Sequence, residues 1–159
     1  MAKQAEHAEP TEEGNATYNS IISTYKLLQR GMTLLLADEG LTQPQFGALR
    51  AVARHGQTPM KTLSEELLVT APNITGIVDR LESKRLLRRV ASREDRRTTM
   101  VELTPRGMKL LDRLTKKYVW FIKTALQEFS AKEQEMLCVL LARLQDELSR
   151  LDSEVDHRA

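Results

Sequence analysis

The 159-residue sequence has one cysteine, Cys138, and three scattered histidines. It therefore offers neither an intramolecular disulfide nor a spacing typical of zinc ligands, and we expect no metal and no other cofactor. No uninterrupted apolar run reaches the roughly 18 residues that a membrane helix needs. The acidic, polar first residues also lack the basic and then apolar segments of a signal peptide. These absences predict a cytoplasmic protein that makes no contact with a membrane.

Glycine is also sparse, and its seven residues are scattered, so no glycine-rich loop is present that could cradle a phosphate. The sequence has no recognisable nucleophile and base motif and no His-Glu-x-x-His zinc-protease motif. We therefore do not expect an enzyme. What the sequence does contain is 41% hydrophobic residues, which is enough apolar surface for a folded core.

The net charge of +2 conceals an uneven distribution. Residues 84–97 carry seven basic side chains against two acidic ones, so the rest of the chain has a net charge of −3. A charged run of this kind can be an ordinary solvated face, or it can be a surface that binds a polyanion such as DNA. The elements around the run have to decide between these interpretations.

Apolar residues recur at helical spacing in six segments, within residues 18–36, 46–52, 63–68, 74–81, 108–129 and 136–151. Thr42 and Ser130 each begin a capping box, and Thr70 is placed to cap the helix that opens at Ala71. Residues 1–15 show no such periodicity and are expected to form a mobile acidic tail. Residues 153–159 are expected to form a C-terminal tail.

Two segments rich in β-branched and apolar residues, 86–91 and 98–104, are joined by the charged stretch 92–97. This pattern predicts a β-hairpin with a basic tip. The predicted fold class is therefore mainly α with a small β-hairpin wing (α+β). The order of elements is that of a winged helix-turn-helix, in which the second short helix enters the major groove of DNA.

Four segments resemble the MarR family of transcriptional regulators, namely 63–67 (LSEEL), 73–82 (NITGIVDRLE), 93–97 (REDRR) and 103–107 (LTPRG). The resemblance extends over residues 16–152 and implies a winged helix-turn-helix domain at 39–104. It also implies a homodimer, held together by a helical module formed by residues 16–38 and 105–152. The leucine-rich last helix agrees with this, because its apolar face is larger than one small winged domain could cover. One departure is Lys84-Arg85, which stands where the family usually has a glycine before the wing strand.

The expected DNA contacts lie on the polar side of the helix that opens at Ala71: Asn73, Thr75, Gly76 and Arg80. Asn can pair with adenine and the Thr methyl can contact thymine, while Gly76 reduces bulk and Arg80 is placed for phosphate or guanine. At the hairpin tip the resemblance implies that Asp95 orients Arg97 into the minor groove. Arg93 and Arg96 are expected to contact phosphates, since one narrow groove cannot accept every arginine.

The predicted function is that of a sequence-specific DNA-binding transcriptional regulator, a repressor that a small-molecule effector releases from a pseudo-palindromic operator in double-stranded DNA. Geometry and resemblance place a crevice between the first helix, the start of the second and the long helix after Pro105. Tyr25, Gln43 and Phe46 would give it an aromatic and amide surface, and basic residues at the base of the wing would favour a small aromatic anion. The alternative is a winged-helix protein that uses the same surface to bind another protein. Cys138, on the apolar side of the last helix, is expected to be a buried, inert thiol rather than a peroxide sensor.

Overall fold

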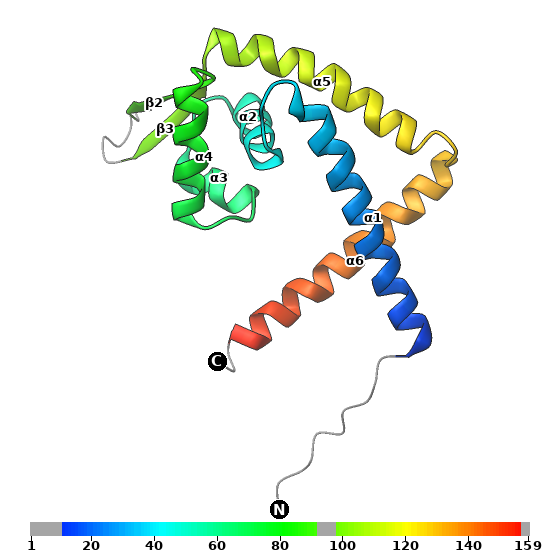
Figure 1. Ribbon diagram of the computed structural model, residues 1–159. Coiled ribbons are helices and arrows are strands. Elements are labelled where there is room, and N and C mark those ends of the chain that lie inside the picture. The colour runs from blue at the N-terminus through cyan, green and yellow to red at the C-terminus, as the bar shows by residue number, and fades with distance from the viewer. Residues whose placement is uncertain (1–10, 92–97, 157–159) are drawn as a thin grey trace, which may run out of the picture. The chain divides into compact units, whose positions relative to one another are not determined.

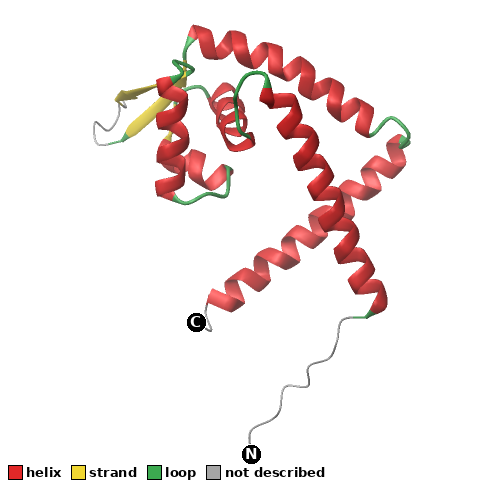
Figure 2. Cartoon of the chain, viewed as in Figure 1, coloured by secondary structure: helices red, strands yellow, loops and turns green. Residues whose placement is uncertain are grey.

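The structure is a computed structural model that describes residues 11–91 and 98–156. In chain order the elements are α1 (Glu12–Ala37), α2 (Gln43–His55), β1 (Thr58–Pro59), α3 (Met60–Glu66), α4 (Ala71–Ser83), β2 (Leu87–Ala91), β3 (Thr99–Leu103), α5 (Pro105–Ala125) and α6 (Ala131–Asp156). Helices dominate, and the strands gather in one small sheet (Figures 1 and 2). The predicted fold class, mainly α with a β-hairpin wing, is confirmed.

The chain forms two compact units, Met1–Tyr118 and Val119–Ala159. The first unit contains the hydrophobic core, which α2, α4, the wing and the first half of α5 build together. Its fully buried side chains include Leu49, Leu63, Leu81, Val101 and Leu114. Each of these contributes about 1.5–3 kcal/mol to folding by leaving water. The core therefore holds α3, α4 and the wing together in one unit.

The sheet has the strand order β1-β3-β2 and is antiparallel throughout. The hairpin pairs Leu87 with Leu103 and Ala91 with Thr99, which agrees with the predicted strands. Strand β1 was not among the predicted strands. It pairs with the outer side of β3, where Pro59 at a sheet edge needs no amide hydrogen. A segment of two residues is too short to show the alternating pattern of a strand. Only the pairing with β3 defines β1 as a strand.

Local capping chemistry sets two of the helix starts as predicted. The Thr42 capping box of α2 is complete, with reciprocal bonds to Gln45, and in the Ser130 box of α6 the backbone N–H of Ser130 donates to Glu133 at 2.7 Å. The prediction for Thr70 was wrong: it occupies the N-cap position of α4, but its side chain caps no amide. Pro72 removes one of the two amide hydrogens that a Thr70 hydroxyl could accept.

Three helices end in the same way, with a residue in the left-handed region that lets two backbone bonds close the last turn. After α4 the amide of Leu86 donates to Leu81 O and the amide of Arg85 donates to Glu82 O. The left-handed residues are Gly40 (φ 58°), Leu68 (φ 51°) and Arg85 (φ 57°). Arg85 thus adopts the conformation that would suit the glycine usual in the MarR family, and the turn is kept without it.

Three helix bounds differ from the prediction. Helix α1 begins at Glu12, inside the segment 1–15 that was expected to be a tail, because the Thr11 hydroxyl accepts from the amide of Gly14 at 3.1 Å and acidic residues occupy the first turn. Helix α5 ends at Ala125, short of Phe129, since the cap of α6 needs a non-helical approach. Helix α6 extends to Asp156, inside the predicted 153–159 tail.

Helix α6 makes up most of the second unit, and none of its side chains within residues 131–151 is buried. Its exposed apolar residues are Met136, Leu137, Val139, Leu140, Leu141, Leu148 and Leu151. Cys138 is also exposed, so the prediction of a buried thiol was wrong: it lies among residues 131–151 of α6, none of which is buried. None of the helices within residues 11–91 and 98–156 combines the length and hydropathy that a membrane span requires.

Candidate DNA-binding surface

Helix α4 presents two chemically different sides. Ile74, Val78 and Leu81 are buried and hold the helix on the core. Asn73 and Arg80 are exposed. A Cβ atom added at Gly76 would meet no atom within 4 Å, so the helix backbone itself is accessible at this point. The structure therefore brings the predicted residues of α4 to one open, polar face.

A groove of about 400 Å³ runs between this face and the start of α2. Asn73, Gly76 and Arg80 line it from α4, and Thr42 and Pro44 line it from the first turn of α2. The aligned peptide dipoles of α2 give its N-terminus a partial positive charge. The groove thus combines an amide side chain, a guanidinium and a helix N-terminus, which are groups that bind phosphates and base edges.

Thr75 lies on the other side of the same face, in a second hollow of about 410 Å³ that Lys61 and Arg89 also line. Its hydroxyl donates to the carbonyl oxygen of Ala71 at 3.0 Å. Because the hydroxyl hydrogen is already used within the helix, Thr75 offers mainly its methyl group and a hydroxyl acceptor to a partner. This agrees with the contact expected for it.

The base of the wing is held by ion pairs that the sequence did not reveal. Arg89 of β2 donates to Asp79 at 2.6 Å and to Glu82 at 2.5 Å, both on α4. Partial burial acts to lower the pKa of Arg89, but the hydrogen bonds and charges of the two carboxylates outweigh it and raise the pKa. Arg88 is paired with Glu102 across the hairpin. The hydrogen bonds that Gln57 and Arg88 donate, together with the charge of Arg88, lower the pKa of Glu102.

The charged run at 84–97 is therefore not one continuous surface of unpaired basic side chains. Arg88 and Arg89 are paired within the chain, and Lys84 donates to the carbonyl oxygen of Gly40 at 2.9 Å. The remaining predicted wing residues, Arg93, Asp95, Arg96 and Arg97, lie outside the described residues. Of the described basic residues of β2, Arg89 thus fixes the wing to α4 and Arg88 joins the two strands of the hairpin.

The three residues predicted to line a ligand crevice have different surroundings. Gln43 donates to the carbonyl oxygen of Gln29 at 2.7 Å and so ties the start of α2 to α1. Tyr25 is exposed, and its hydroxyl accepts from the side chain of Gln29 at 2.6 Å. Phe46 is only 3% exposed and packs against Tyr118, with ring centroids 5.9 Å apart. Gln29 links the first two residues, whereas Phe46 belongs to the core.

Arg50 was not singled out from the sequence. Its guanidinium lies 4.3 Å from the ring centroid of Tyr118 and 5.8 Å from that of Phe46. Such cation–π contacts are worth about 0.5–1 kcal/mol where solvent reaches them. The sequence around Arg50 does not predict this contact, because Tyr118 is far from Arg50 in the chain. Only the packing of α5 on α2 brings the two side chains together.

The start of α5 forms a tight joint with the turn after α4. The Thr104 hydroxyl donates to the carbonyl oxygen of Arg85 at 2.7 Å and accepts from the amide of Gly107 at 3.0 Å. A Cβ atom added at Gly107 would lie 2.1 Å from the carbonyl oxygen of Leu86, so only glycine fits there. The Thr-x-x-Gly pattern was part of the family resemblance, but its role in this joint follows from the structure.

A two-helix turn, a polar face on its second helix and an adjoining hairpin define a winged helix-turn-helix protein. The MarR family model matches residues 39–98. The chain is 28% identical to the HTH-type transcriptional regulator MhqR of Bacillus subtilis, in an alignment that covers 84% of this chain and 92% of that protein.

Solved structures agree. A probable transcriptional regulator from Pseudomonas aeruginosa is 32% identical, with a TM-score of 0.67, over 77% of this chain and 94% of that one. BpsR of Bordetella bronchiseptica has the same fold at 19% identity, with a TM-score of 0.74, over 92% of this chain and 98% of that one. The chain belongs to the MarR family and is a DNA-binding transcriptional regulator.

Proposed function

We propose that the protein binds DNA sequence-specifically by inserting α4 into the major groove. The observation that carries this proposal is the open face of α4, where Asn73, Gly76 and Arg80 line one groove and Thr75 lies in the next. Asn73 would hydrogen-bond to adenine and the Thr75 methyl group would contact a thymine methyl, while Arg80 would bind phosphate or guanine. Gly76 would allow the backbone to approach the base edges.

The wing would complete the contact. In this proposal Asp95 orients Arg97 into the minor groove, and Arg93 and Arg96 bind phosphates. Support comes from Arg89, which holds β2 against α4 and so fixes the base of the wing beside the helix that reads the major groove. These contacts would supply much of the salt-dependent affinity.

The regulator would act as a cytoplasmic homodimer, with residues 16–38 and 105–152 as its dimerisation module and 39–104 as its DNA-binding domain. Exposed apolar side chains on α1 and α6 support this, because a second copy would remove them from water. Two-fold symmetry would place the two copies of α4 in successive major grooves, roughly 34 Å apart on a pseudo-palindromic operator.

We further propose that the protein is a repressor that a small aromatic anion releases from DNA. The ligand would bind beside Tyr25, Gln43 and Phe46, where α1 and α2 meet. BpsR, which shares the fold, has its DNA binding regulated by 6-hydroxynicotinic acid. A ligand could lower operator affinity only to the extent that it binds the DNA-incompatible arrangement of the dimer more tightly.

The test is selection of genomic fragments by the purified protein, followed by footprinting and gel shifts at several salt concentrations. Asn73→Ala and Thr75→Ala should reduce discrimination between the selected site and random DNA, by about 1–3 kcal/mol at a contacted base pair. Lys116→Ala is a matched control, because Lys116 lies on α5 and is paired with Asp112 at 2.9 Å. Equal discrimination by all three variants would show that α4 does not read the sequence. Addition of salicylate to the selected complex tests release.

A further inference from the structure

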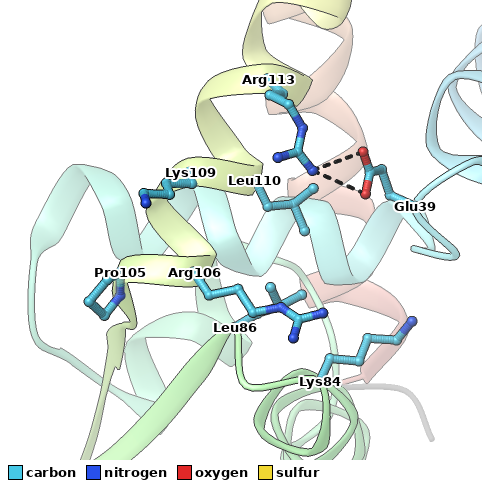
Figure 3. A pocket seen from close by; sticks show the side chains of 8 residues that line it. All are labelled: Glu39, Lys84, Leu86, Pro105, Arg106, Lys109, Leu110 and Arg113. Atoms are coloured by element: carbon cyan, nitrogen blue, oxygen red, sulfur yellow. Dashed lines mark hydrogen bonds and ion pairs between the residues drawn. The ribbon is translucent and has the colours of Figure 1, made fainter.

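A cavity of about 460 Å³ lies at the opposite end of α4 from Asn73. It is formed where the turn after α4, the first turns of α5 and the link after α1 meet (Figure 3). Leu86, Pro105 and Leu110 supply an apolar wall, and the charged lining residues are Glu39, Lys84, Arg106, Lys109 and Arg113. Its volume lies within the range of about 300–1,000 Å³ that is typical of small-ligand sites.

The charge of this lining is unbalanced, with four cations against one carboxylate. Arg113 donates to both oxygens of Glu39, at 3.2 and 3.4 Å, so this pair is neutral. Lys84 donates to a carbonyl oxygen, which is uncharged. Arg106 extends between Leu86 and Lys84 in Figure 3, and within residues 11–91 and 98–156 it has no ion-pair partner. Arg106 and Lys84 therefore face one cavity with no anion between them.

We propose that this cavity binds a small organic anion carrying at least two negative charges, a dicarboxylate or a phosphate ester. One anionic group would lie between Arg106 and Lys84, and the carbon skeleton would contact Leu86 and Leu110. Charge-assisted hydrogen bonds from guanidinium and ammonium groups are the strong class of such bonds. Lys84, Arg106 and Lys109 are the three cations that no carboxylate in the cavity matches, and a dianion would neutralise two of them.

The position of the cavity separates it from the surface proposed to bind DNA. Lys84 follows Asn73 by eleven residues, which corresponds to roughly 16 Å along a helix at a rise of 1.5 Å per residue. The cavity also adjoins the joint at Gly107, since Leu86 contributes both a wall of the cavity and the carbonyl oxygen beneath Gly107. A bound anion would bridge the ends of α1 and α4 and the start of α5, and should raise the unfolding temperature of the protein.

Calorimetry on the full chain at constant ionic strength tests this with succinate and with glycerol 3-phosphate, and acetate is the monoanionic comparison. At least one dianion should bind with a Kd of about 1 mM or tighter, and acetate should bind more weakly. The two dianions distinguish the carboxylate source from the phosphate source. If neither binds at about ten times that concentration, the proposal is wrong.

Variants locate the site. Arg106→Gln should weaken dianion binding about tenfold, because one charge-assisted contact is lost. Glu39→Gln should strengthen it by roughly threefold, since Arg113 is released and a like charge is removed. Lys116→Gln, which removes a charge on the same helix outside the cavity, should change nothing. Retained circular dichroism and thermal unfolding of Arg106→Gln would show that its fold is intact.

A last variant distinguishes this site from nonspecific anion binding to the DNA-contacting surface. Arg80→Ala should leave dianion binding unchanged, and Arg106→Gln should leave operator affinity unchanged. Dianion binding that is lost in Arg80→Ala and kept in Arg106→Gln would place the anion on the α4 surface and overturn the proposal. The outcomes for dianion binding do not depend on whether the proposed operator contacts are correct.

Discussion

Helices α4 and α6 are both amphipathic, but among the described residues only α4 has its apolar side buried. Its Ile74 and Val78 are 2% and 0% exposed. On α6, Leu140 and Leu148 are both 51% exposed. The winged unit therefore completes its own core, whereas these apolar side chains of α6 remain exposed to solvent. The difference teaches that folding alone fixes the geometry of the winged unit, and that the uncovered side of α6 is the place to test the proposed homodimer.

The largest expected effect comes from placing charge on the uncovered side. Leu140→Glu combined with Leu148→Glu should abolish the proposed homodimer, because the carboxylates would be buried without partners. We expect an association constant lower by roughly a thousandfold, or about 4 kcal/mol, in sedimentation experiments. Lys132→Glu, in the first turn of α6, is the control and should remain dimeric. A double variant that sediments as the unaltered protein does would mean that this face is not the interface.

The next largest effect is expected in the first unit, where a substitution at Gly107 should reduce the stability of the fold. Gly107→Ala places a methyl group 2.1 Å from the carbonyl oxygen of Leu86, so α5 or the turn after α4 must shift. We expect a loss of about 3 kcal/mol or more in the free energy of unfolding, measured by urea denaturation.

Gly76→Ala is the matched control for this variant, since it is also a glycine within a helix but has no atom within 4 Å of the added Cβ. It should stabilise α4 by about 1 kcal/mol and weaken operator binding. Equal destabilisation by the two substitutions would contradict the close contact at Gly107.

The same contrast explains which features could be predicted from the sequence. The capping boxes at Thr42 and Ser130 could be recognised because their partners lie three residues away. Likewise the periodicity of α4 identified Asn73 and Arg80 as outward-facing. Strand β1 and the pairs of Arg89 could not, because they depend on residues that only folding brings close. The charged run at 84–97 indicated where the wing lies in the sequence. It did not indicate which of its basic side chains are paired within the chain.

A smaller effect on stability is expected at the ends of α1, α3 and α4. There the same left-handed backbone conformation is adopted by a glycine in one case and by larger residues in the other two. Arg85→Gly and Leu68→Gly should each stabilise the protein by about 0.5–1 kcal/mol, because a side chain in the left-handed region costs energy that glycine avoids. Leu68 is 92% exposed, so its removal forfeits little burial. Gly40→Ala should do the reverse and cost about 1 kcal/mol. Thermal unfolding distinguishes these outcomes, and a destabilised Arg85→Gly would contradict the role assigned to this turn.

The smallest effect concerns the base of the wing and its response to acid. Hydrogen bonds from Gln57 and Arg88 lower the pKa of Glu102 in the folded protein. The ionised carboxylate therefore contributes stability above its unfolded pKa, about 4.3, and this contribution is lost as the pH falls through the lower folded value. Glu102→Gln should accordingly have a shallower loss of stability on acidification below pH 4.3 than the unaltered protein. The pair of Arg88 and Glu102 lies within the first unit, so Glu102→Gln should sediment as the unaltered protein does. A change in oligomeric state would mean that the wing takes part in association.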